Sequence, residues 1–221
     1  MFDDFWAASR FSPLHQRRLG DRLRDFRPQP PLIDPLELPA APRPLPKPKD
    51  RLQRLFQNRK SSREFAGTPL TDKQLGTILG ALGDNSFPSA GGLNPLRCYA
   101  FFNGRAVRYD VRRHALQDIG PAPEDLAEIL GTPEVPPLAI VLVLKDNEAF
   151  EKYGERAGRF GLIEAGAAAQ SICLRLAEQK LGGYLLGGVA DNEMLHALGL
   201  PRELRVATAI ACGHIARDMI T

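Results

Sequence analysis

The most informative part of this chain reads Asn58-Arg59-Lys60-Ser61-Ser62-Arg63-Glu64-Phe65. It places two guanidinium groups four residues apart, with an ammonium group and two hydroxyls between them. Guanidinium forks match the oxygens of a phosphate, and short donors can converge on the same small volume. We therefore predict a phosphate monoester site at Arg59, Lys60, Ser61 and Arg63. The alternative for an isolated basic cluster is a solvated turn.

A second informative segment follows about one helix later and reads Phe87-Pro88-Ser89-Ala90-Gly91-Gly92-Leu93-Asn94-Pro95-Leu96. Adjacent glycines expose backbone N–H groups without side-chain obstruction, so a flat ring can lie against the main chain. The predicted contacts are Pro88, Ser89, Ala90 and Gly91, and the alternative is an ordinary glycine turn. Together the two segments describe a site for a phosphorylated planar ring.

In these segments the sequence resembles the nitroreductase superfamily of FMN-dependent oxidoreductases. Members carry an Arg-x-Ser-x-Arg-x-Phe element, matched here at residues 59–65, and then a Pro-Ser loop, matched at residues 88–89. The form Pro-Ser-Ala-Gly-Gly-Leu is most similar to the SagB-type branch, which includes azoline dehydrogenases that oxidise thiazolines and oxazolines in modified peptides. The resemblance covers roughly residues 50–215.

The resemblance implies an α+β, nitroreductase-like fold, in which helices pack on a mixed, mostly antiparallel sheet. It implies FMN as cofactor and a homodimer with FMN at the subunit interface, where the Pro-Ser loop reaches the partner's flavin. It also implies that the backbone at Gly187 and Gly188 lies beside flavin N5. His214 and Arg217 fall where relatives place further cationic phosphate ligands.

Lys152-Tyr153 is the candidate catalytic pair. In azoline dehydrogenases, which this chain resembles, a Lys-Tyr pair is implicated in removing the ring proton while hydride passes to the flavin. A lysine base must be held neutral by burial or by nearby positive charge, and Arg156 and Arg159 are close in sequence. The alternative is a helix end without chemical function.

Three functions stay open at this point. The first is hydride transfer between flavin N5 and an azoline-type substrate, either a small molecule or a peptide. The second is NAD(P)H-dependent reduction of nitro compounds or quinones. The nicotinamide and nitro-substrate preferences of typical nitroreductases are weak guides to this chain. Here Gly92-Leu93-Asn94-Pro95-Leu96 replaces the stretch that follows the serine in those proteins. The third is a non-catalytic flavin-binding interaction subunit.

Composition excludes several other classes. The 221 residues are 43% hydrophobic and 25% charged with a formal charge of +3, which predicts a globular cytoplasmic protein without a nucleic-acid-binding stripe. Three cysteines and four histidines lack ligand spacing, so no metal site or disulfide framework is predicted. There is no GxGxxG or Walker motif. The longest apolar run, residues 138–144, is too short to span a membrane.

The chain divides into an N-terminal part, residues 1–49, and an FMN-binding domain, residues 50–221. Nine prolines within residues 28–48 predict an extended arm, which either wraps a partner subunit or serves as a linker. In the domain we expect a helix after Asp50, a capping box at Thr71, a long helix over 159–180, and strands near 97–102, 106–111, 138–144 and 205–212. One or two amphipathic helices are expected in residues 1–26. Their candidates for burial are Phe2, Phe5, Trp6, Phe11, Leu14, Leu19, Leu23 and Phe26.

Overall fold

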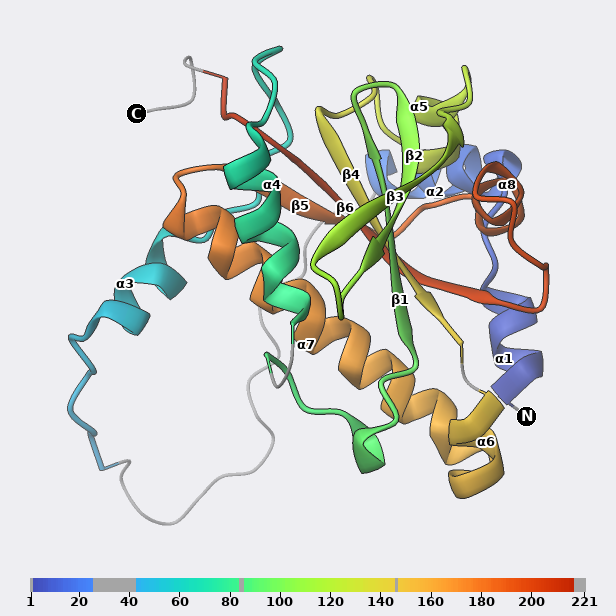
Figure 1. The fold of residues 1–221 in the computed structure, drawn as a ribbon, viewed down its shortest axis with the longest axis horizontal. Coiled ribbons are helices and arrows are strands. Elements are labelled where there is room, and N and C mark those ends of the chain that lie inside the picture. The colour runs from blue at the N-terminus through green and yellow to red at the C-terminus, as the bar shows by residue number, and fades with distance from the viewer. Residues whose placement is uncertain (1, 26–42, 84–85, 146, 217–221) are drawn as a thin grey trace.

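The computed structural model describes residues 2–25, 43–83, 86–145 and 147–216, in which helices cover both faces of one six-stranded sheet (Figure 1). The strand order is β3-β2-β1-β4-β6-β5, and every neighbouring pair is antiparallel. The strands are β1 (Leu96–Phe102), β2 (Arg105–Asp110), β3 (Ala115–Pro121), β4 (Leu138–Leu144), β5 (Gly182–Leu186) and β6 (Arg205–Gly213). The predicted α+β class is confirmed.

Strand β4 lies at the centre of the core, and all seven of its residues are buried. Its side chains alternate between the two faces of the sheet, as strand geometry requires. Leu138, Ile140 and Leu142 pack in the cluster formed with α4 (Asp72–Leu79) and α7 (Arg156–Glu178). The intervening residues pack with α5 (Leu126–Leu130) and α8 (Asp191–Ala197) on the opposite face. The strand expected near residues 138–144 is therefore present, and it is buried on both faces.

Helices α4 and α7 start where local sequence signals place them, within a few residues. The Thr71 side chain accepts from the Gln74 backbone while the Gln74 side chain bonds the Thr71 backbone, so the predicted capping box is confirmed. Helix α7 begins three residues before its predicted start and ends two before its predicted end. By length and composition α7 is the one helix in the described chain that could cross a bilayer, but core helices pass the same test, and 44% of its apolar window is buried.

The N-terminal helices α1 (Phe2–Ser9) and α2 (Pro13–Asp25) lie against the domain. Helix α1 packs where α6 (Asn147–Tyr153) meets α7. Phe2 and Trp6 are buried in a cluster with Leu144, and the Phe2 amide donates to the Glu155 carboxylate at 2.6 Å. A side chain at Gly158 would lie 2.3 Å from the Phe2 ring, so glycine is needed for this approach. Helix α1 therefore stabilises the junction between α6 and α7.

The burial expected in the N-terminal part is confirmed for Phe2 and Trp6 only. Phe5 and Leu14 are each 56% exposed. Phe11 is half-buried. The side chains of Leu19, Leu23 and Phe26 and residues 28–42 of the arm lie outside the described part, while residues 43–48 are exposed without regular structure.

Two strands were not predicted. Strand β3 is exposed along most of its length, so its sequence lacks the alternation that marks a half-buried strand. Strand β5 begins with two glycines, which ordinarily weaken a strand. Here a Cβ at Gly183 would lie 2.6 Å from Leu176, and one at Gly182 would lie 2.7 Å from the Ser62 Cβ. Close approach of α7 and of the segment carrying Ser62 therefore requires both glycines.

Candidate functional site

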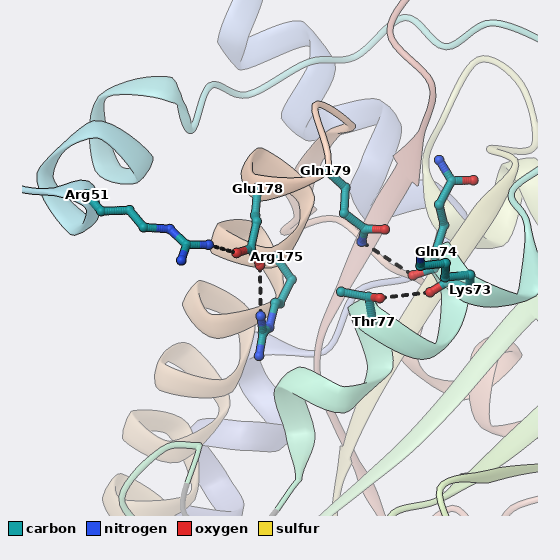
Figure 2. Close-up of polar contacts among 7 residues, drawn as sticks. All are labelled: Arg51, Lys73, Gln74, Thr77, Arg175, Glu178 and Gln179. Atoms are coloured by element: carbon teal, nitrogen blue, oxygen red, sulfur yellow. Dashed lines mark hydrogen bonds and ion pairs between the residues drawn. The ribbon is translucent and has the colours of Figure 1, made fainter.

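Helix α3 (Arg51–Asn58) leads directly into the predicted phosphate segment. Asp50 caps α3 by accepting from the Gln53 backbone N–H at 2.8 Å, as the sequence predicted. Figure 2 shows that Arg51 and Arg175 both pair with Glu178, which ties α3 to the last turn of α7. These hydrogen bonds, with that from Arg175 foremost, lower the pKa of the Glu178 carboxyl. The Gln179 side chain reaches the Gln74 carbonyl at 3.4 Å, so α4 joins the same junction.

After α3 the chain runs beside β5 and the end of β6. Ser61 forms a parallel bridge with Gly183, and the Ser62 amide donates to the Gly183 carbonyl at 3.2 Å. The Ala66 amide donates to the His214 carbonyl at 2.7 Å. The backbone of His214 therefore lies next to this segment, whereas Arg217 lies outside the described residues.

The predicted cationic phosphate ligands lie beside β5. Arg59 is half-buried and lines a recess of about 10 Å³ with Lys60, Cys173 and Gly183. Burial raises the pKa of the Cys173 thiol, and the charge of Arg59 opposes that rise. Arg63 is exposed, and its guanidinium carbon lies 5.3 Å from the centre of the Tyr184 ring.

The Pro-Ser loop contacts α7 nearer the N-terminal end of that helix, at Glu164, and in this loop Pro88 is exposed and Ser89 half-buried. The short helical turn η2 (Ala90–Gly92) follows, with Gly91 and Gly92 at φ +62° and +67°. This backbone conformation strains residues with a side chain, which explains the glycine pair. The Ser89 hydroxyl accepts from the Asn94 amide at 2.9 Å, and the Ala90 amide donates to Glu164 on α7 at 2.8 Å.

Lys152 and Tyr153, at the end of α6, meet this loop. A Cβ added at Gly91 would lie 2.5 Å from the Tyr153 hydroxyl and 2.7 Å from Lys152 Nζ. Lys152 Nζ is 5.2 Å from the centre of the Tyr153 ring, which in turn packs edge-on against Phe160. Lys152 is exposed, so this chain alone does not provide the burial expected of a neutral lysine.

Gly187 and Gly188 follow β5. Nothing lies within 4 Å of a Cβ built at Gly187, and the Gly188 carbonyl accepts from the Gln16 side chain at 2.5 Å. Gly187 borders a cavity of about 210 Å³ that the sequence did not predict. Its lining comprises Phe5, Trp6, Ser9, Phe11, Leu162, Leu186, Gly187, Val189, Asp191, Val206, Ala207 and Thr208. The aromatic residues of the N-terminal part were the one signal that could have indicated it.

Asp191 is the acidic residue of this cavity. Its carboxylate accepts from the Phe11 amide at 2.8 Å, which holds the turn between α1 and α2 against α8. Burial raises the pKa of Asp191, and the Phe11 hydrogen bond and the charge of Arg10 partly offset that rise.

The two predicted half-sites lie far apart within one chain. The Pro-Ser loop contacts α7 at Glu164, while the phosphate segment contacts it at Cys173 and Leu176. Twelve helical residues from Glu164 to Leu176 rise about 18 Å. The structure therefore groups Pro88, Ser89, Ala90 and Gly91 with Lys152 and Tyr153, and groups Arg59, Lys60, Ser61 and Arg63 with His214 and the start of β5.

Residues 56–214 match the model of the nitroreductase family, so the chain belongs to that family. Membership of this family makes the chain a flavin-dependent oxidoreductase.

Individual relatives agree with this assignment. A Methanocaldococcus jannaschii protein that carries the name of a nitroreductase is 27% identical over 170 residues, covering 67% of this chain and 84% of that protein. A nitroreductase structure from Ralstonia eutropha matches with a TM-score of 0.69 and 26% identity, over 79% of this chain and 88% of that one. The Escherichia coli microcin synthetase complex with truncated pro-MccB17 bound contains a chain of the same fold. It matches with a TM-score of 0.70 and 17% identity, over 97% of this chain and 91% of that one.

Proposed function

We propose that this protein is an FMN-dependent dehydrogenase of the SagB type, which oxidises an azoline ring in a small molecule or a peptide. The observation that carries the proposal is the convergence of Lys152 and Tyr153 on Gly91 in the Pro-Ser loop. The fold match to a chain of the microcin synthetase complex, which holds a truncated precursor, supports it across nearly the whole chain.

The residues present fit FMN. Arg59, Lys60, Ser61 and Arg63 would hold its phosphate through charge-assisted hydrogen bonds. From Gly183, beside Ser61, to Gly187 the backbone extends about 13 Å, so an FMN molecule lying along β5 could place its phosphate near Ser61 and its ring near Gly187. The open space at Gly187 would admit the ring. When bound, the flavin supplies the hydride acceptor at N5.

Lys152 and Tyr153 would handle the proton of the same reaction. Azoline oxidation to the aromatic azole removes one hydride and one proton from the ring. Lys152 Nζ is the base that accepts the proton, and the Tyr153 hydroxyl next to it orients the substrate. Because Lys152 is exposed in one chain, a partner subunit and the bound substrate would exclude water from it.

The two half-sites support a homodimer. Ile163, Gly166 and Gln170 form an exposed stripe on α7, and Ile163 is 63% exposed. The Pro-Ser loop contacts α7 beside this stripe, at Glu164. In a dimer packed through the stripe the loop would lie next to the partner subunit, as the resemblance to the nitroreductase superfamily implies.

Ile163→Glu should therefore convert the dimer to monomers that purify without flavin. A charge in the centre of an apolar helix contact is costly because it is desolvated there without a partner. Light scattering after size-exclusion chromatography measures the mass, and visible absorbance measures the flavin. The matched control is Ile119→Glu on the exposed strand β3, where the original side chain is 41% exposed. A dimeric, yellow Ile163→Glu protein would contradict the proposed interface.

The visible spectrum of the purified protein tests the function. Under anaerobic conditions we expect a 2-substituted thiazoline-4-carboxamide to bleach the flavin band and to leave the corresponding thiazole. Bleaching by NADH or NADPH, with no response to the thiazoline, would favour a nitro or quinone reductase. A flavin that no donor reduces would favour a non-catalytic interaction subunit, and a colourless protein that cannot be reconstituted would contradict FMN binding.

A further inference from the structure

Glu164 is a buried acidic residue in the middle of α7, with only 3% of its surface exposed. One carboxylate oxygen, Oε1, accepts the Ala90 N–H at 2.8 Å. The other, Oε2, is buried without a hydrogen-bond partner among the described residues. A buried carboxylate with a single hydrogen bond lowers stability relative to an apolar residue of the same size. Residues that cost stability in this way concentrate at functional sites.

The contacts of Glu164 lead to the candidate catalytic pair. Its partner Ala90 immediately precedes Gly91, the residue against which Lys152 Nζ and the Tyr153 hydroxyl lie. Ser171, two turns later on the same side of α7, donates to the Ser86 carbonyl at 3.3 Å. Helix α7 thus holds the loop at two points, and the Glu164 contact is the one next to Gly91.

We propose that Glu164 is a positioning residue: through the Ala90 amide it fixes the turn at Gly91 against Lys152 and Tyr153. The inference rests on the proposed dehydrogenase function, since positioning matters only if that pair acts on substrate. It assigns Glu164 no contact with substrate or flavin. Its effect on the reaction passes through the loop backbone, whose misplacement by a fraction of an ångström lowers the rate.

Three variants test this role in the full-length, flavin-loaded protein. Glu164→Met fills a similar volume but has no oxygen to accept the Ala90 N–H. Glu164→Asp has a side chain shorter by one methylene, so its carboxylate lies farther from the Ala90 amide. Glu164→Gln keeps an acceptor oxygen for the Ala90 amide. Hydrogen exchange of the peptide covering residues 86–95 reports the loop directly, and flavin bleaching by the thiazoline probe reports the reaction.

We expect Glu164→Met and Glu164→Asp to speed exchange in the loop and to slow bleaching by about tenfold, with flavin content and dimer mass unchanged. Glu164→Gln should restore both readouts to within about threefold of the parent. Met at this position should leave the melting temperature unchanged or raise it. Normal exchange and normal bleaching in both Glu164→Met and Glu164→Asp would overturn the proposal. If the Glu164→Met variant does not fold, the Glu164→Asp variant still tests the proposal, because it keeps a carboxylate at this position.

The double variant Glu164→Met, Lys152→Ala distinguishes a positioning role for Glu164 from a general loss of structure. If Glu164 acts through the pair, Glu164→Met should cause no further loss of bleaching in the Lys152→Ala background. A second tenfold loss there would overturn the inference. If Lys152→Ala alone bleaches like the parent protein, the proposed function fails, and unchanged loop exchange in Glu164→Met would overturn the positioning role separately.

Discussion

Arg63→Glu should yield a folded protein that purifies without flavin. Two charge-assisted hydrogen bonds from one guanidinium contribute about 1.5–3 kcal/mol each, so their loss alone weakens phosphate binding by more than about 100-fold. The introduced carboxylate adds repulsion. Arg63 is exposed and its recorded contact is with the Tyr184 ring, so the fold should survive the substitution. The ratio of flavin to protein absorbance measures the effect.

Arg112→Glu is the matched control for this charge reversal. Arg112 is exposed in the turn between β2 and β3, far from the phosphate segment in the sheet order, and the reversal changes the net charge equally. Arg112→Glu should retain the parent flavin content. Normal FMN content in Arg63→Glu would refute the phosphate assignment, and loss of flavin in both variants would point to net charge instead.

Flavin-loaded Gly91→Ala protein should lose at least about 90% of the dehydrogenase rate. The added methyl would occupy the position next to the Tyr153 hydroxyl and Lys152 Nζ, at 2.5 and 2.7 Å. Both groups are at the ends of flexible side chains, so they would move and the protein would fold. Stopped-flow bleaching by the thiazoline probe gives the rate.

Gly92→Ala separates this displacement from backbone strain. Gly92 has nearly the same φ, +67° against +62° at Gly91, but nothing lies within 4 Å of its added Cβ. Both variants therefore carry a similar left-handed strain of about 1–2 kcal/mol, and only Gly91→Ala touches the pair. Equal losses in the two variants would show that loop strain, and not Lys152 and Tyr153, sets the rate.

The sequence predicted those parts of the fold in which local and tertiary preferences agree. Strand β4 is apolar at every position because both of its faces are covered, and the capping box at Thr71 is a purely local signal. Strand β5 was missed because its glycines are required by residues distant in sequence. Leu176 packs closely against Gly183, and Ser62 packs closely against Gly182. No local pattern encodes such approaches.

The same distinction applies to the site. The order of the motifs along the chain indicated the candidate site segments. The structure brings Lys152 and Tyr153 to Gly91, although some sixty residues separate them in sequence. Glu164 was not singled out from the sequence, because its hydrogen-bond partner in the described part of the chain is a backbone amide, and backbone amides leave no sequence pattern. The cavity beside Gly187 was missed because its walls come from α1, α7, β5 and β6 together.

The separation of the two half-sites along α7 has a genetic consequence. In the proposed dimer each reaction centre takes its phosphate segment from one chain and its Pro-Ser loop from the other. A mixed dimer of one Arg63→Glu chain and one Gly91→Ala chain would therefore collect both lesions in one centre and leave the second centre intact. Two inactive alleles expressed together would complement each other, restoring up to about a quarter of the parental activity if subunits assort at random.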